Sequence, residues 1–430
     1  MVKRFIFGLL LLVTTTTLEA QRSNISPYSY FGIGESFGQL TVEQSSMGGI
    51  GVAMKDINHL NFTNPAAIAD LKITTYSLGG EARFLTLKES NVMTSGSSTN
   101  LSYIALGIPL GNKMGLTFGL QPFSKMGYAL LNREYQGDEL REVSRFSGSG
   151  GTNRLYAGFG AYLVEGVSLG IEAGFIFGSI ENNIYNQRYN VSLGTKHERE
   201  LNIRGGEIKL GAQYQTELKN KLKFTTGAAF ALNTNLSATG SERLYSLSLS
   251  NSGLEIGKDT LYSRSISGDI RMPLRATFGV GLGKKDKWFA ELSQEYREEW
   301  STSNQINLSS GRYQYESGRK LSFGGYYIPK INSISNYWDR VTYRAGVRFE
   351  KLGLLVDGLG IGKSLTSIND FGINIGFGLP LPKLLSNINL GFEYGQRGII
   401  DNNLIKENYY NIKLSLSLNS LSWFIKRKID

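Results

Sequence analysis

The chain of 430 residues contains no cysteine, only two histidines and only eight prolines. The absence of cysteine excludes disulfide scaffolds and thiolate metal sites. The chain shows no Ser-His-Asp arrangement around His59 or His197, which argues against a hydrolase triad. Metal binding by Lys196–Glu200 (KHERE) is a weaker interpretation of that stretch than a solvated charged loop. We therefore expect no enzyme activity, no cofactor and no bound metal.

Long apolar runs are also missing, apart from one at the start. The opening residues, MVKRFIFGLLLLVTTTTLEAQ, place Lys3 and Arg4 before a short apolar run and a small residue at Ala20. This order is typical of a secretory signal peptide, so we predict that residues 1–20 are removed by cleavage after Ala20. Every later apolar run is interrupted by polar or charged residues, which predicts no transmembrane helix.

Charge of one sign is not concentrated anywhere. The net charge is +10, but the basic residues are spread along the chain with acidic residues among them. A nucleic-acid-binding surface would gather them in one patch, so we expect no nucleic acid partner. By contrast, glycine (52), tyrosine (23) and phenylalanine (22) are abundant. Glycine and aromatic residues with two-residue alternation suit a membrane β-barrel.

The alternation itself runs through most of the chain after Ile73. In residues 153–164, for example, Leu155 and Phe159 alternate with Gly158 and Gly160. One face of each such strand is apolar, and the other carries glycine, serine, asparagine and charge. In lipid, the apolar face points outward and the polar face lines the lumen.

This pattern predicts fourteen strands, joined alternately by short and longer connections. Strict alternation of this kind is typical of an outer-membrane barrel with periplasmic turns and extracellular loops. An even number of strands places both termini in the periplasm, and Trp423 and Phe424 would belong to an aromatic C-terminal signal. The predicted strands are 73–85, 99–109, 113–122, 153–164, 166–178, 201–215, 221–233, 271–283, 286–298, 339–350, 352–358, 368–379, 386–397 and 407–419.

A barrel of fourteen strands is too wide for its own side chains to fill and narrower than an open porin. Residues 21–72 are the only long segment assigned neither to strands nor to loops. We therefore expect them to fold into the lumen as an N-terminal plug, followed by a transmembrane barrel over residues 73–430. The predicted fold is an all-β, antiparallel, 14-stranded transmembrane barrel with a plug.

The sequence resembles the FadL-type family of outer-membrane transporters for long-chain fatty acids and other hydrophobic compounds. Three stretches carry the resemblance: MGGIGVAMKD, LNFTNPAAIADL and the proline-bearing FGLQPFSKMGY. The resemblance implies that substrate enters at the extracellular loops and leaves sideways. The exit in that family is a gap made by an inward kink of the third strand, near an Asn-Pro-Ala motif.

Two groups of residues are the candidates for plug and exit. The plug and gating residues are Gly48, Gly49, Gly51, Asn64, Pro65 and Ala66, and the exit residues are Pro122, Phe123, Met126 and Tyr128. Other interpretations of the same residues remain. Asn-Pro favours an ordinary turn, and Pro122 can simply end a strand because proline cannot donate a ladder hydrogen bond. The glycines lack the strand–helix context of a nucleotide site, so close backbone packing explains them better.

Alternation also places charged residues in the lumen, mostly as a mixed-charge network. Among the cations, Arg344 and Arg348 share one face of a strand and are candidate contacts for a ligand carboxylate. The inward-facing charged residues are Glu172, Lys209, Arg275, Glu291, Glu295, Arg297, Arg344, Arg348, Glu350, Glu393 and Lys413.

The predicted function is passive uptake of hydrophobic small molecules, such as fatty acids, across the cell outer membrane. The expected surroundings are outer-membrane lipid and lipopolysaccharide. A different class of function is a barrel subunit or shuttle of a larger envelope assembly, such as type-nine secretion, with long loops as docking surfaces for envelope proteins. A third is a hydrophilic porin, which would conduct ions where a plugged barrel would not.

Overall fold

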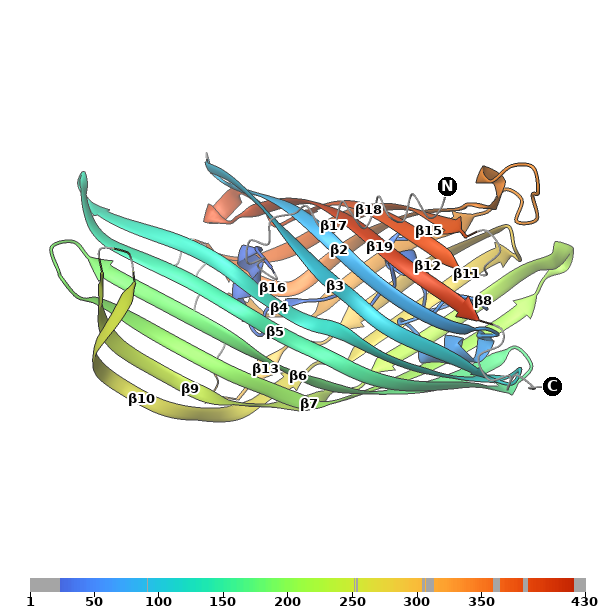
Figure 1. The fold of residues 1–430 in the computed structure, drawn as a ribbon, viewed down its shortest axis with the longest axis horizontal. Helices are drawn as coiled ribbons and strands as arrows, with labels where there is room; N and C mark the ends of the chain where they lie inside the picture. Colours follow the sequence, from blue (N-terminus) through green and yellow to red (C-terminus); the bar gives the residue numbers. More distant parts are fainter. Residues whose placement is uncertain are drawn as a thin grey trace, which may run out of the picture.

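A computed structural model describes residues 24–90, 92–250, 252, 254–303, 306, 313–358, 364–381 and 386–420. The predicted signal peptide and the pair Trp423 and Phe424 lie outside these residues. Within the described ranges, no helix is both long and apolar enough to cross a membrane. The main architecture is one antiparallel sheet in which the last strand pairs with the first strand of the wall, so the sheet closes into a barrel (Figure 1).

The wall contains fourteen strands, ten of them continuous and four broken into two pieces. Each broken strand keeps its two pieces in one line because both pair with the same neighbouring wall strand. The continuous strands are β2 (Thr74–Glu89), β3 (Val92–Leu110), β4 (Met114–Gln136), β5 (Glu139–Val164), β6 (Val167–Arg188), β7 (Gly194–Glu217), β16 (Thr342–Asp357), β17 (Leu365–Pro380), β18 (Asn387–Arg397) and β19 (Lys406–Ser420). The broken strands are β8 (Leu222–Ala231) with β9 (Thr234–Leu249), β10 (Glu255–Met272) with β11 (Arg275–Lys284), β12 (Trp288–Arg297) with β13 (Ser301–Thr302), and β14 (Tyr313–Tyr315) with β15 (Gly318–Tyr327).

The predicted strand number is correct, but two of the fourteen assignments are wrong and offset each other. The predictions 339–350 and 352–358 are one strand, β16, in which the supposed turn at Gly353 is an irregularity between Lys351 and Leu355. The missing strand is β14 with β15, a region that the sequence pattern assigns to loop. Its apolar alternation is limited to Leu321, Phe323 and Tyr327, which explains why the pattern is too weak to detect.

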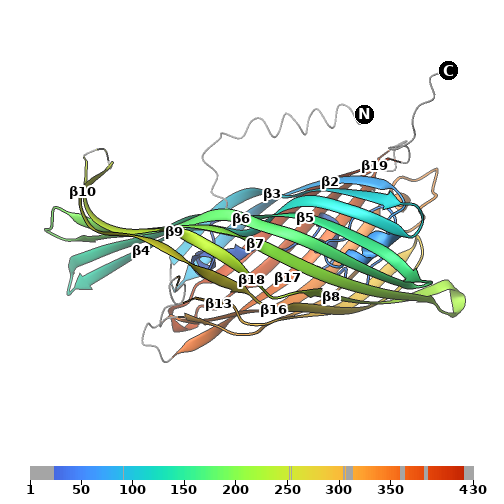
Figure 2. The ribbon, with the colours of Figure 1, turned by 90° about the horizontal axis from the view of Figure 1, so that it is seen from below.

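The connections are also shorter than predicted on one side of the barrel. The predicted long loops 86–98, 123–152, 179–200 and 234–270 consist mostly of strand. Residues 86–98 belong to β2 and β3, and the other three ranges belong to β4–β7, β9 and β10, which continue well past the barrel wall. These strands form projecting hairpins on the left of both views (Figures 1 and 2). Strict alternation of short and long connections also fails, because residues 328–341 form a long connection at the end that carries the short turns.

The N-terminal segment, residues 24–73, precedes the wall and contains only short elements. They are η1 (Pro27–Tyr30), β1 (Glu35–Ser36), α2 (Val42–Ser45) and η2 (Pro65–Asp70). Thr41 and Gln44 form a reciprocal capping box that starts α2. The segment is drawn in blue among the wall strands in Figure 1, and most of its side chains from Thr41 to Met54 are buried.

Inward-facing glycines of the wall make room for the backbone of this segment. A Cβ atom on Gly227 would lie 1.9 Å from the carbonyl oxygen of Val52, and one on Gly346 would lie 2.1 Å from the carbonyl carbon of Met47. Both distances are far below van der Waals contact. The abundance of glycine on the polar face of the strands therefore has a steric cause: the wall and the segment touch backbone to backbone at these positions.

Gly346→Val should displace the N-terminal segment without preventing barrel formation, because the added side chain would overlap Met47. Overpacking of this kind costs about 1–3 kcal/mol. The measurement is trypsin cleavage after Lys55 in the folded, heat-modifiable barrel, which should become faster. Gly206→Val is the matched control, since its Cβ would meet nothing closer than 3.9 Å. Equal protease resistance of the two variants would contradict the steric account.

Candidate functional site

The wall has an interruption between β3 and β4. Their pairing begins with Leu110 opposite Met114 and stops at Ile104 opposite Leu120. Beyond this point β3 continues to pair with β2, and β4 continues to pair with β5. The two strands therefore separate in the half of the wall that faces the projecting hairpins.

Pro122 lies at the point of separation, two residues beyond the last β3–β4 pair. It pairs with Asn153 of β5, and the β4–β5 register shifts between Pro122 and Ser124. The shift is possible because Gly151, at φ +156°, has no side chain: a Cβ there would lie 2.4 Å from the carbonyl oxygen of Ser124. The proline is thus inside β4, not at its end.

The three other predicted exit residues come after Pro122 and face the interior. Phe123, Met126 and Tyr128 are buried and belong to one apolar cluster with Ile33 of the N-terminal segment. Side chains from β6, β7, β9 and β10 complete the cluster. An apolar region therefore lies directly behind the interruption in the wall.

The N-terminal segment takes the place of β3 as the neighbour of β4. Ser36 of β1 lies opposite Ser124, and the backbone N–H of Phe37 donates to the carbonyl of Phe123 at 2.9 Å. The Asn24 side chain donates to the carbonyl of Lys125 at 3.2 Å. These contacts satisfy the β4 edge from Phe123 to Lys125 and tie the segment to the interruption.

The predicted gating glycines form part of an anion-binding turn of the backbone. Gly48 and Gly49 have φ of +73° and +84°, in the left-handed region. The backbone N–H of Gly51 donates to one carboxylate oxygen of Glu291 at 2.9 Å, and that of Ala53 donates to the other at 3.3 Å. Successive N–H groups of this kind bind anions in nests. Here the group that these N–H groups contact is the Glu291 side chain of wall strand β12.

Asn64-Pro65-Ala66 lies against a different part of the wall from the exit residues. Asn64 caps η2 by accepting from the N–H of Ala66, and its amide nitrogen lies 3.1 and 3.2 Å from the carbonyl oxygens of Ala212 and Ala228. The contacts of η2 are mainly with β5, β6 and β7. The motif therefore anchors the segment to the wall, while residues 24–37 contact the exit residues.

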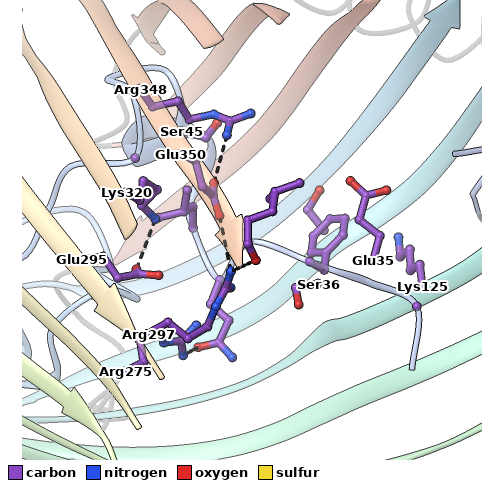
Figure 3. A pocket seen from close by; sticks show the side chains of 18 of the residues that line it. Glu35, Ser36, Ser45, Lys125, Arg275, Glu295, Arg297, Lys320, Arg348 and Glu350 are labelled. Atoms are coloured by element: carbon purple, nitrogen blue, oxygen red, sulfur yellow. Dashed lines mark hydrogen bonds and ion pairs between the residues drawn. The ribbon is translucent and has the colours of Figure 1, made fainter. Parts of the chain in front are cut away.

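A chamber of about 330 Å³ lies between the N-terminal segment and the wall (Figure 3). Its lining is strongly charged, with five carboxylates and nine cationic side chains. The carboxylates are Glu35, Glu81, Glu295, Glu350 and Glu393, and the cations are Arg83, Lys125, Lys209, Arg275, Arg297, Lys320, Arg348, Arg397 and Lys413. All eleven charged residues predicted from alternation to face inward are either buried or line this chamber.

The charges of the chamber are paired with one another. Eight of the nine cations lie within 2.7 to 3.9 Å of a carboxylate, either in the lining or just behind it. Figure 3 shows the pairs Lys320–Glu295 and Arg348–Glu350. Lys125 has no ion pair among the described residues, and its ammonium lies 4.3 Å from the centre of the Phe37 ring. Pairing leaves little free charge for a ligand.

Arg344 and Arg348, the predicted contacts for a ligand carboxylate, already bind other side chains of the protein. Arg348 lies within ion-pair distance of Glu350, Asp370 and Glu393 and also contacts the Tyr409 hydroxyl. Arg344 donates to Asn389 at 3.0 Å and does not line the chamber. A ligand carboxylate reaches Arg348 only by displacing one of its present partners.

Glu35 is the site residue that sequence analysis missed. It accepts from Asn24 at 2.9 Å and forms ion pairs with Arg83 of β2 and Arg397 of β18 at 2.9 and 2.7 Å. One carboxylate thus joins the segment to both sides of the β19 seam. The available signal was a single acidic residue inside the otherwise uncharged stretch YFGIGESFG.

Glu291→Gln should loosen the glycine turn, because the new amide N–H₂ faces backbone N–H groups where an acceptor was. Loss of a buried acceptor costs about 1–3 kcal/mol. Hydrogen–deuterium exchange of peptides covering Gly49–Met54 should accelerate accordingly. Glu81→Gln is the control, since the Glu81 side chain lines the chamber without a hydrogen bond or ion pair among the described residues. Exchange that is equally slow in both variants would refute the role of Glu291.

A second titratable contact of the segment involves Asp56 and His59, which lie 3.1 Å apart. Burial opposes ionisation of Asp56, but His59 and two backbone N–H groups outweigh it and lower the pKa of this carboxyl to about 2. Burial also disfavours the His59 imidazolium, yet the Asp56 carboxylate raises the pKa of His59 above its usual value. Each group therefore stabilises the charged form of the other.

The lowered pKa of Asp56 and the raised pKa of His59 together set how the stability of the segment depends on pH. The contribution of His59 is complete below its unfolded pKa of about 6.5 and is lost as pH rises through its raised folded pKa. That of Asp56 is complete above about pH 3.9 and is lost as pH falls toward 2. We expect the segment to be held most tightly between roughly pH 4 and 6.5. Proton NMR of the two histidines should show a raised His59 pKa that falls in Asp56→Asn; an unchanged value would contradict the pairing.

Comparison with solved structures identifies the fold. The chain is similar to a Pseudomonas aeruginosa FadL homologue, with a TM-score of 0.58 and 12% identity over 91% of this chain and 99% of that one. The Pseudomonas putida toluene transporter TodX gives a TM-score of 0.57 and 15% identity over 90% and 100%. The Ralstonia pickettii toluene transporter TbuX gives 0.55 and 13% over 90% and 99%. At these identities the likeness concerns the fold alone.

Sequence comparison assigns the family. No curated protein sequence matches this chain. The family model described as BamG matches residues 1–430, the whole sequence. The predicted FadL-type resemblance therefore holds at the level of the fold, and the chain belongs to the BamG family.

Proposed function

We propose that the protein lies in the outer membrane, with both termini in the periplasm. There, hydrophobic small molecules such as long-chain fatty acids would pass between its chamber and the membrane. The interruption between β3 and β4 would be the lateral exit, and the N-terminal segment would be the plug that opens or closes it. The observation that carries this proposal is the end of β3–β4 pairing at Ile104 and Leu120.

The surroundings of the exit support an apolar cargo. Phe123, Met126 and Tyr128 present apolar surface immediately behind the interruption, together with Ile33 of the segment. The same fold occurs in proteins described as toluene transporters. The paired charges of the chamber would contact only the polar end of such a molecule, so the apolar path would run along the cluster beside β4.

A disulfide tests whether the segment must leave β4 for passage. The chain has no native cysteine. Ser36 and Ser124 lie directly opposite each other, next to the hydrogen-bonded pair of Phe37 and Phe123. Directly opposed residues outside the hydrogen-bonded pairs have Cα atoms about 4.5 Å apart, within the range for a disulfide.

The double variant Ser36→Cys/Ser124→Cys should therefore take up fatty acid into proteoliposomes only after reduction. The expected loss on oxidation is nearly complete, and reductant should restore the wild-type rate. The single variants are controls that oxidation should not affect. Equal uptake before and after reduction, with the disulfide confirmed by mass spectrometry, would refute a plug that moves away from β4.

A second candidate function is a barrel subunit of an envelope assembly. The observation that favours it is the internal pairing of the chamber charges, which makes the lumen a braced interior and leaves Lys125 as the one lining cation without an ion pair among the described residues. In this case the segment would brace the barrel permanently. Partners would co-purify in fixed stoichiometry, and the oxidised disulfide variant would remain fully functional in cells.

A further inference from the structure

The interruption leaves β3 with an open edge along Val92–Ser102, which we call the β3 edge. All of these residues except Ser102 pair with β2 on one side, and on the other side no described residue supplies a backbone partner. The N-terminal segment satisfies the facing edge of β4 at Phe123–Lys125, whereas beside the β3 edge its Ile25 side chain lies next to Gly96. Among the residues that the structure describes, one of the two edges created by the interruption is therefore paired and the other is not.

The β3 edge carries no charge and no proline, and its one register shift with β2 lies at its lower end, at Ser102. Its sequence, VMTSGSSTNLS, contains no charged residue and no proline. Val92 to Ser97 are all exposed, with Val92 and Met93 about two-thirds exposed. Natural edge strands are commonly shielded by lysine, proline, bulges or covering elements because free N–H and C=O groups invite pairing. The corresponding upper part of β4, in contrast, contains Arg133 and Glu134.

Part of this edge lies at membrane level. Phe84 of β2 stands opposite Ser97 of β3 and opposite Tyr410 of β19, and both aromatic side chains are about half exposed on the outer surface. The apolar outer belt of the barrel thus reaches the level of Ser97. Open sheet edges are not tolerated against hydrocarbon, where each unsatisfied backbone group costs several kcal/mol. An extended segment paired with Ser97–Ser102 would satisfy these backbone groups.

A second copy of this chain does not fit. Two copies in one membrane share the same orientation, so their β3 strands run in the same direction and cannot pair antiparallel. Wall strands are tilted by about 35–45°. When two walls face each other through a two-fold axis along the membrane normal, their strands cross at about twice that angle. Such a crossing allows contact at one point but not pairing along eleven residues.

We infer that the β3 edge is a strand-addition site for a different protein that shares the outer membrane. The partner would supply an extended, uncharged segment whose backbone pairs with Val92–Ser102. Its side chains would be apolar beside Leu101 and polar beside Ser95, matching the outer surface of β3. Main-chain hydrogen bonds would provide most of the binding, as in other cases of strand addition. This inference deepens the second candidate function by naming the surface and chemistry of the partner.

Site-specific photo-cross-linking tests the inference in intact cells. The photoreactive residue p-benzoylphenylalanine replaces Ser95, Ser97 or Thr99, and Asn202 serves as the matched control. Asn202 is also polar and exposed, but its strand is paired on both sides, with β6 and β9. Mass spectrometry identifies the cross-linked peptide, and heat-modifiable migration confirms a folded barrel.

The expected result is one partner segment, captured from all three edge positions and not from Asn202. The labelled positions are two residues apart along β3. The cross-linked residue of the partner should therefore also shift by two from one position to the next, as strand pairing requires. Ser97→Lys should reduce the product at Thr99 by about tenfold without changing barrel folding, since a charge blocks an edge.

Other products would overturn the inference. Cross-links only to lipopolysaccharide, or only to the N-terminal residues of the same chain, would show a different occupant of the edge. No product above that of Asn202 would show that the edge is unoccupied. If stable partners co-purify although the edge gives no cross-link, the edge proposal alone fails. If no partner co-purifies at all, the assembly function fails with it.

Discussion

The contact between the backbone of the N-terminal segment and the glycines of the wall is the constraint on which the structure depends. A fourteen-stranded wall encloses more volume than inward side chains of ordinary size fill. Here that volume is occupied by main chain, which approaches the wall at Gly227 and Gly346 closely enough to exclude any Cβ. Main chain brought so close needs hydrogen-bond partners, and the wall supplies them through Glu291 and the strand carbonyls near Asn64.

The same requirement explains the shape of β4. At Pro122 the strand loses its neighbour β3, and the N-terminal segment provides the missing backbone partners through Ser36 and Phe37. Because Glu35 also pairs with Arg83 and Arg397, the cover of β4 and the closure of the barrel share one ionic cluster. The two candidate functions differ in one respect. A transporter requires the N-terminal segment to move away from β4, whereas a barrel subunit keeps it in place. In either case the N-terminal segment does not pair with the β3 edge.

Alternation and composition were sufficient to predict the barrel and the inward charges from the sequence, whereas the strand number is correct because one divided strand offsets one missed strand. The strand boundaries were predicted wrongly where apolar and polar residues do not alternate. Above the apolar belt both faces of a strand contact water, so the upper parts of β5 and β7 have no apolar face and were predicted as loops. Glu35 and Glu291 bind residues that are distant in the sequence, such as Arg397 for Glu35 and Gly51 for Glu291. No local pattern in one sequence encodes such pairs.

Electron–electron double resonance measures directly whether the N-terminal segment has one defined position inside the barrel, through the distance between two spin labels. The cysteine-free chain accepts one spin label at Ile57 of the segment and one at Lys285 of the β11–β12 turn, both of which are exposed. In liposomes at pH 5.5, the account predicts a single narrow distance distribution. A broad or multimodal distribution in the resting protein would contradict it.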